Sequence, residues 1–101
     1  MEKRRAQVIQ LPDNFIGKAD REKLASFGAH VIGRGRATRW HWAKDSAGAD
    51  LFEIYKGGPN ESLMARIRRN RPLDVFRAED AAGRLIVAGT LEHVMAVLDR
   101  E

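Results

Sequence analysis

Short turn-forming motifs divide this chain into brief apolar segments, and this spacing constrains the fold more than any other feature of the sequence. The motifs stand at residues 12–14, 45–50, 57–60 and 80–83 and are rich in glycine, proline, aspartate and asparagine. These residue types favour turns, so the helices and strands between them must be short. Because 101 residues with 44% hydrophobic content supply one core and too little chain for two, we expect a single α+β domain over residues 1–101. Residues 1–5 are interpreted as a flexible basic tail.

Three elements are expected before the turn at residues 45–50. Ala6–Leu11 is β-branched at its centre and is followed by a proline, which predicts a strand and then a turn. Lys18–Phe27 is rich in helix formers, and Gly28 is placed to cap the end of a helix. Ala29–Lys44 predicts a strand that is bent or bulged around its two glycines.

A first hairpin is predicted where this strand meets Leu51–Lys56 across the turn. Pairing Trp42 with Phe52 also pairs Trp40 with Ile54, which places four large apolar side chains on one face of the hairpin. The tryptophans are then expected in the core. The opposite face carries Arg39, His41, Glu53 and Tyr55.

A helix is predicted over Glu61–Asn70, with Asn60 as its N-cap and Pro72 as the residue that stops it. In this helix Leu63, Met64 and Ile67 are expected to face inward.

A second hairpin is predicted from Asp74–Glu79 and Arg84–Ala88, with Gly83 at the left-handed position of the turn. Thr90 can cap a final helix. The apolar residues of that helix follow the i, i+3, i+4, i+7 spacing closely and are Leu91, Val94, Met95 and Leu98.

The two hairpin-plus-helix units resemble each other in their turns and in their helix starts, which raises the hypothesis of a ββα unit used twice. Convergence of turn and helix-start residues is the alternative. The expected fold is an antiparallel sheet of four to five strands with about three short helices mainly on one face.

Catalytic and metal chemistry find little support in the residue pattern. The chain contains no cysteine, which excludes disulfides and cysteine-based zinc or iron–sulfur sites. None of His30, His41 and His93 has a second ligand at metal-binding spacing, and no serine stands in a nucleophile motif. We therefore expect no catalytic residue, no metal and no cofactor. His41 is expected to pair with Glu53 across the hairpin, as a plain surface pair.

No apolar stretch reaches the length of a signal peptide or a membrane span, so a cytoplasmic protein with no membrane partner is expected. Residues 1–44 hold ten Lys/Arg and four Asp/Glu, a net charge of +6, whereas residues 45–101 hold eight and ten, a net charge of −2. Positive clusters of this kind attract polyanions, although they also serve to keep a small domain soluble.

The leading functional hypothesis is a small non-enzymatic binding protein that contacts a nucleic-acid backbone. Cations beside aromatic residues are typical of sheets that bind nucleic acids. The proposed contacts are Arg34, Arg36 and Arg39 on the sheet and Arg66, Arg68 and Arg69 on the helix.

The alternative hypothesis is a protein-interaction module, a small regulator or inhibitor or a homodimer, that uses an exposed sheet face or edge. Its proposed surface consists of Arg39, His41, Glu53 and Tyr55. Arginines that converge on one face would favour nucleic acid, whereas an apolar patch at a sheet edge would favour a protein partner.

Overall fold

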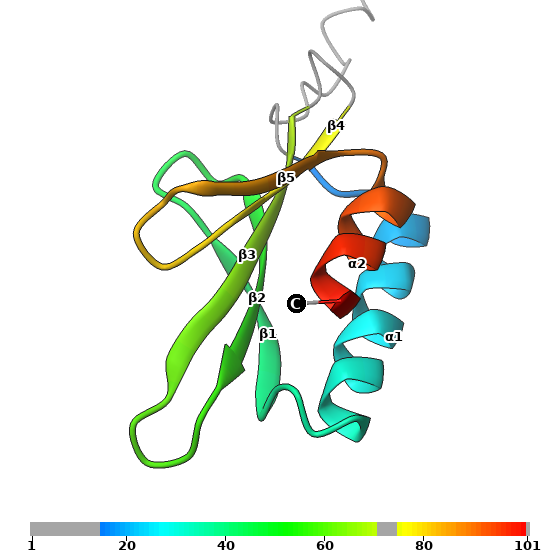
Figure 1. Cartoon of the computed structure of the whole chain (residues 1–101). Helices are drawn as coiled ribbons and strands as arrows, with labels where there is room; N and C mark the ends of the chain where they lie inside the picture. The colour runs from blue at the N-terminus through cyan, green and yellow to red at the C-terminus, as the bar shows by residue number, and fades with distance from the viewer. Residues whose placement is uncertain (1–14, 71–74, 101) are drawn as a thin grey trace, which may run out of the picture.

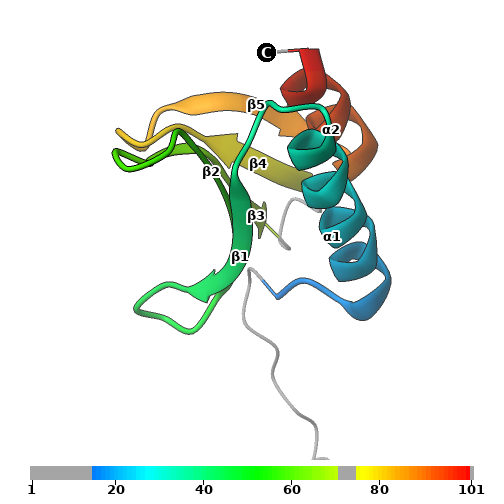
Figure 2. The ribbon, with the colours of Figure 1, turned by 90° about the horizontal axis from the view of Figure 1, so that it is seen from below.

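The computed structural model describes residues 15–70 and 75–100. Its sheet has five antiparallel strands that neighbour one another in chain order. The strands are β1 (Arg39–Lys44), β2 (Asp50–Lys56), β3 (Ser62–Asn70), β4 (Val75–Glu79) and β5 (Leu85–Gly89), and the helices are α1 (Lys18–Gly33) and α2 (Leu91–Arg100). Both helices lie on one side of the sheet (Figure 1, Figure 2). The predicted α+β class and the antiparallel sheet are confirmed.

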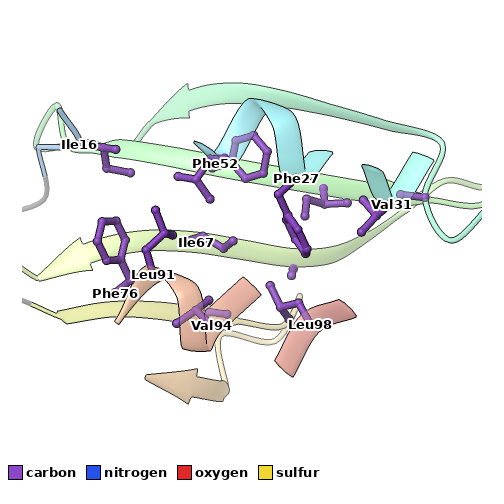
Figure 3. Packing of buried hydrophobic residues seen from close by; sticks show 14 residues of the cluster. Ile16, Phe27, Val31, Phe52, Ile67, Phe76, Leu91, Val94 and Leu98 are labelled. Carbon is purple, nitrogen blue, oxygen red and sulfur yellow. The ribbon is translucent and has the colours of Figure 1, made fainter. Parts of the chain in front are cut away.

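The core lies between the two helices and the sheet. Figure 3 shows side chains of both helices directed toward the strands, among them Phe27, Val94 and Leu98 opposite Phe52 and Ile67. The predicted apolar stripe of α2 is confirmed, since Leu91, Val94 and Leu98 are buried and Met95 packs against the core while half-exposed.

The first hairpin has the predicted register. Trp40 is opposite Ile54 and Trp42 is opposite Phe52. The ring centroids of both tryptophans lie near that of Phe52, at 5.3 and 5.0 Å, which is the range of favourable aromatic pairs. Both tryptophans therefore contribute to the helix-covered side of the sheet, as expected.

The prediction of a helix over Glu61–Asn70 is wrong, because this segment forms β3. Its buried residues Ala65 and Ile67 are two apart, which is the period of a strand. Hydrogen bonds to β2 on one side and β4 on the other satisfy its backbone. Of the three residues expected to face inward, Ile67 is buried and Met64 packs against the core, whereas Leu63 is paired with Tyr55.

The predicted end of the first helix is also wrong. The helix α1 continues through Gly28 to Gly33, and the strand that follows begins only at Arg39. Val31 extends the buried stripe of Leu24, Phe27 and Gly28 by one more turn, so the segment expected as the start of a strand completes the helix. The described part of the chain contains two helices rather than three.

The ββα repeat is not confirmed, since the first of its two units has a strand where the helix was expected. The strand predicted at Ala6–Leu11 and the basic tail lie outside the described residues. Within the described ranges, neither helix combines the length and the apolar character that a membrane crossing requires.

Candidate interaction surfaces

The outer face of the sheet, meaning the face turned away from α1 and α2, is built around a buried carboxylate. Side chains alternate across a strand, so Glu53 points to the outer face while its neighbours Phe52 and Ile54 point to the helix side. Even so, Glu53 is only 6% exposed. Its oxygen atoms accept three hydrogen bonds. The hydrogen bonds come from His41 Nε2 at 2.7 Å, Tyr55 Oη at 2.9 Å and Arg66 Nε at 2.7 Å.

The charge of Glu53 is stabilised where it is buried. Burial by itself would raise the pKa of this carboxyl, but the hydrogen bonds with His41, Arg66 and Tyr55 outweigh burial and lower the pKa. Burial and the neighbouring carboxylate raise the pKa of Tyr55. Glu53 is therefore ionised and fully engaged at neutral pH, which leaves it poorly suited to act as a general base.

Arg39 joins the same network at the β1 edge. Its guanidinium donates to both carboxylate oxygens of Glu61 at 2.8–3.0 Å and lies 4.2 Å from the centroid of the Tyr55 ring. A bidentate arginine–carboxylate pair stacked on an aromatic ring is a rigid, directional arrangement. The structure thus brings together all four residues of the predicted protein-interaction surface, Arg39, His41, Glu53 and Tyr55.

Arg68 and Arg77 extend the network toward the far strands. Arg68 lies 3.6 Å from Asp45 and 3.5 Å from Glu79, and Arg77 lies 3.6 Å from Glu79. The four arginines of this face are thus matched by four carboxylates. The arginines are Arg39, Arg66, Arg68 and Arg77, and the carboxylates are Asp45, Glu53, Glu61 and Glu79.

The six arginines predicted to contact nucleic acid do not form one surface. Arg39, Arg66 and Arg68 lie on the outer face. Arg34 and Arg36, beyond the end of α1, pair with Asp99 of α2, so they are not sheet residues as expected. Arg69 lies 5.5 Å from the ring of Phe76 and 3.7 Å from Asp20 of α1, on the helix side of the sheet. Because residues 62–70 form β3, Arg66, Arg68 and Arg69 do not lie on a helix as expected.

The edge strand β5 is a feature that the sequence reasoning missed. Its five residues, Leu85–Gly89, carry no charge and no proline. Leu85 is 53% exposed and is the one large apolar residue that counts as exposed, rather than half-buried or buried, among the described residues. The uncharged run could have been noticed in the sequence, but only the strand order places it at an edge.

Metal ligands do not gather on either surface. Within residues 15–70 and 75–100, no three His, Asp or Glu side chains are placed to hold a metal ion. Comparisons with protein-family models, with curated proteins and with solved structures found no match for this chain.

Proposed function

We propose that this protein is a non-enzymatic protein-interaction domain that binds a second copy of itself by antiparallel pairing of β5. The observation that carries the proposal is the β5 edge of the sheet, which within the described residues is uncharged, lacks proline and bears the exposed Leu85, with the single bulge at Ile86 as its one protective feature. Natural proteins usually protect an edge strand with charges, proline, bulges or a covering element, because an open edge pairs with other chains.

The opposite edge of the sheet shows what such protection looks like. The strand β1 carries Arg39 and Lys44 at its two ends, and their side chains are 45% and 66% exposed. One edge of the sheet thus carries charged side chains, whereas the other carries none. This contrast supports a role for β5 in pairing with another strand.

A second copy is the partner that best fits β5. Two identical strands paired antiparallel are related by a two-fold axis, and such an interface is closed. The dimer would contain a continuous sheet of ten strands, five from each copy, ending on both sides in the charged β1. Pairing of β5 with β1 would instead propagate without closure, and the charges of β1 oppose it. Self-pairing places no charged side chain of β5 opposite another.

The arginines support a protein partner over a nucleic-acid backbone. Each of the six proposed phosphate contacts lies within 4 Å of a carboxylate. Phosphate would have to compete with those carboxylates for the arginines, which reduces the gain from counterion release.

Sedimentation velocity over a wide concentration series tests the dimer. We expect a concentration-dependent monomer–dimer equilibrium that moves to monomer when Leu85 and Ala88, both exposed, are replaced together by lysine. The matched control is Ser46→Lys with Ala47→Lys, which adds the same charge in an exposed turn and should leave the dimer intact. A wild-type protein that is monomeric at every concentration, or a β5 variant that dimerises as well as the control, would overturn the proposal.

Disulfide trapping locates the interface, since the chain has no cysteine of its own. Single-cysteine variants at Leu85, Val87 and Ala88 are oxidised under mild conditions and analysed by mass. Cross-linking requires Cα atoms within about 7 Å of each other, so the position nearest the two-fold axis should form a covalent dimer. Ser46→Cys should remain monomeric. Failure of all three β5 positions, or equal cross-linking at Ser46, would place the interface elsewhere.

A further inference from the structure

A small pocket opens on the helix side of the sheet, between the strands and the end of α2. Its volume is about 270 Å³, and its lining residues come from five separate segments: Arg36, Lys56, Met64, Ile86 and Leu98. Three of these are apolar and two are cationic. The pocket therefore combines polar and apolar lining, and a small-molecule site typically uses a few convergent polar groups to orient a ligand whose apolar part is buried.

Two β-bulges each contribute one residue to the lining of the pocket. Ile54 is paired with Ala65 and Tyr55 with Leu63, so Met64 is the extra residue of β3. In the second hairpin Ala78 is paired with Val87 and Glu79 with Leu85. Ile86 is therefore the extra residue of β5.

Both extra residues pack against the helix side of the sheet. A bulge adds one residue to one strand and re-aims its side chain. Here two bulges place Met64 and Ile86 under α2, beside the buried Leu98. Two coincident bulges with apolar residues aimed at one cavity indicate a built site rather than an accidental gap.

The two cations at the pocket differ in how far other protein groups already bind them. Arg36 Nη1 donates to the backbone carbonyl of Asp99, and its side chain is only 18% exposed. This bond holds the guanidinium in place. Its Nη1 also lies 3.8 Å from a carboxylate oxygen of Asp99, which is beyond hydrogen-bond distance, so a ligand would share Arg36 with Asp99 and bind to the remaining N–H donors of the five that an arginine has. The carboxylate of Asp99 is itself shared with Arg34 and His30.

Lys56 contributes a charge that the described residues leave unmatched. It is exposed at the end of β2, and no carboxylate of the described chain forms an ion pair with its ammonium group. The pocket therefore combines an oriented guanidinium, an available ammonium and an apolar floor.

We propose that this pocket binds a small carboxylate with a short apolar chain, its carboxylate between Arg36 and Lys56 and its chain against Met64, Ile86 and Leu98. Charge-assisted hydrogen bonds to a planar guanidinium suit a carboxylate well. A water occupies about 30 Å³ of liquid, so the pocket has room for a ligand of roughly eight or nine non-hydrogen atoms. Hexanoate is a probe of that size. The proposal does not depend on dimerisation through β5.

Titration of ¹⁵N-labelled protein with hexanoate tests the proposal by amide shift changes. We expect saturable shifts centred on the pocket residues, with a Kd of about 0.1–1 mM for a ligand of this size. Hexanol and hexylamine keep the chain but lose the anion, and acetate keeps the anion but loses the chain. All three should bind about tenfold or more weakly. Equal binding of hexanol, or shifts spread over the whole surface, would overturn the proposal.

Three variants separate the parts of the site. Lys56→Gln removes the available charge and should weaken hexanoate about tenfold, whereas Lys18→Gln removes the same charge from a lysine outside the pocket and should leave binding unchanged. Ile86→Phe fills the cavity without a change of charge and should abolish binding in a protein whose far-UV spectrum is unchanged. Equal affinity in the Lys56 and Lys18 variants, or undiminished affinity in a folded Ile86 variant, would refute the assignment.

Discussion

Gly28 shows how a single residue reconciles a helix with the sheet beneath it. It is buried in the middle of α1, and a Cβ atom at this position would come within 2.8 Å of Nε1 of Trp40. The absence of a side chain thus lets the indole of Trp40 pack against the helix backbone. A glycine in a helix interior is ordinarily less favourable than alanine by about 0.5–1 kcal/mol. Close packing against Trp40 offsets this loss of helix propensity.

Gly28→Ala should therefore lower the free energy of unfolding, by about 1–3 kcal/mol for an overpacked core, against the sign that helix propensity predicts. Gly33→Ala is the matched control, because a Cβ there meets nothing within 4 Å; it should be neutral or slightly stabilising. Urea unfolding of both variants measures the difference. If the two alanines have the same effect, the close contact with Trp40 does not constrain position 28.

Glu53 illustrates how a buried charge is held on an otherwise open face. Its lowered pKa means that the unfolded chain binds a proton more readily than the folded chain does. Stability from this group is present above its ordinary pKa of 4.5 and is lost as pH falls through the lower folded value. Burial would raise the pKa of Asp50, but hydrogen bonds from Lys44 and the Ile16 amide lower it. Asp50 therefore also stabilises the fold above its ordinary pKa of 3.8, and this stability is lost as pH falls below that value.

We expect the free energy of unfolding to decline as pH falls below about 4.5, and Glu53→Gln to flatten that decline. At neutral pH the same variant should be less stable by about 1–3 kcal/mol, because Arg66 loses its charged acceptor. Urea titrations at a series of pH values provide both quantities. Glu22→Gln, at an exposed residue of α1, serves as control. A variant that keeps the wild-type pH slope would show that Glu53 does not carry this stability.

At the scale of the elements, β3 is the strand on which the sheet depends. It is the central strand of the five, with β2 and β4 as its neighbours. Its Ile67 is fully buried beneath the helices, whereas Leu63, also on β3, is only half-buried. The same strand presents Arg66 to the outer network and Ala65 to the core. The alternating side chains of β3 thus contribute to both the outer network and the core.

Ile67→Ala should reduce the free energy of unfolding by about 2–5 kcal/mol, the cost of deleting a fully buried aliphatic side chain. Leu63→Ala should cost clearly less, since part of that side chain already contacts solvent. Chemical denaturation of the two variants tests the strand assignment, because a helix over this segment would bury both leucine and isoleucine. Equal losses at the two positions would contradict the described strand.

At the scale of the whole molecule, the arginines predicted to contact phosphate are spread over the surface and paired with carboxylates. The formal net charge is +4, but the predicted phosphate contacts fall into three separate groups, on the outer face, at Asp99 and on the helix side. Without a continuous cationic surface, few phosphates can be neutralised at once.

We therefore expect affinity for nucleic acids no tighter than about 10 µM at physiological salt, which is the non-specific range. Fluorescence anisotropy with duplex and single-stranded DNA and RNA at two salt concentrations measures it. Replacing Arg66 and Arg69 together by alanine should alter any weak binding little, because the two side chains lie on opposite sides of the sheet. Tight binding with a steep salt dependence that this double variant removes would restore the nucleic-acid hypothesis.

Local patterns determined several parts of this structure in advance. The register of the first hairpin, with Trp42 opposite Phe52, follows from a turn of known type and the alternation of large apolar residues. The buried stripe of α2 follows from its spacing alone. The clustering of Arg39, His41, Glu53 and Tyr55 was predictable for the same reason, since both strands belong to one hairpin. In each case, residues close in sequence decide the arrangement.

Only the tertiary structure decided the rest. Residues 61–70 are compatible with a helix, and their identity as β3 comes from hydrogen bonds to β2 and β4 on both sides. The length of α1 depends on burial of Val31 and on the indole that fits over Gly28. The separation of the arginines and the exposure of β5 follow from strand order, and two bulges contribute Met64 and Ile86 to the lining of the pocket. These features rest on contacts between distant segments, which no local pattern specifies.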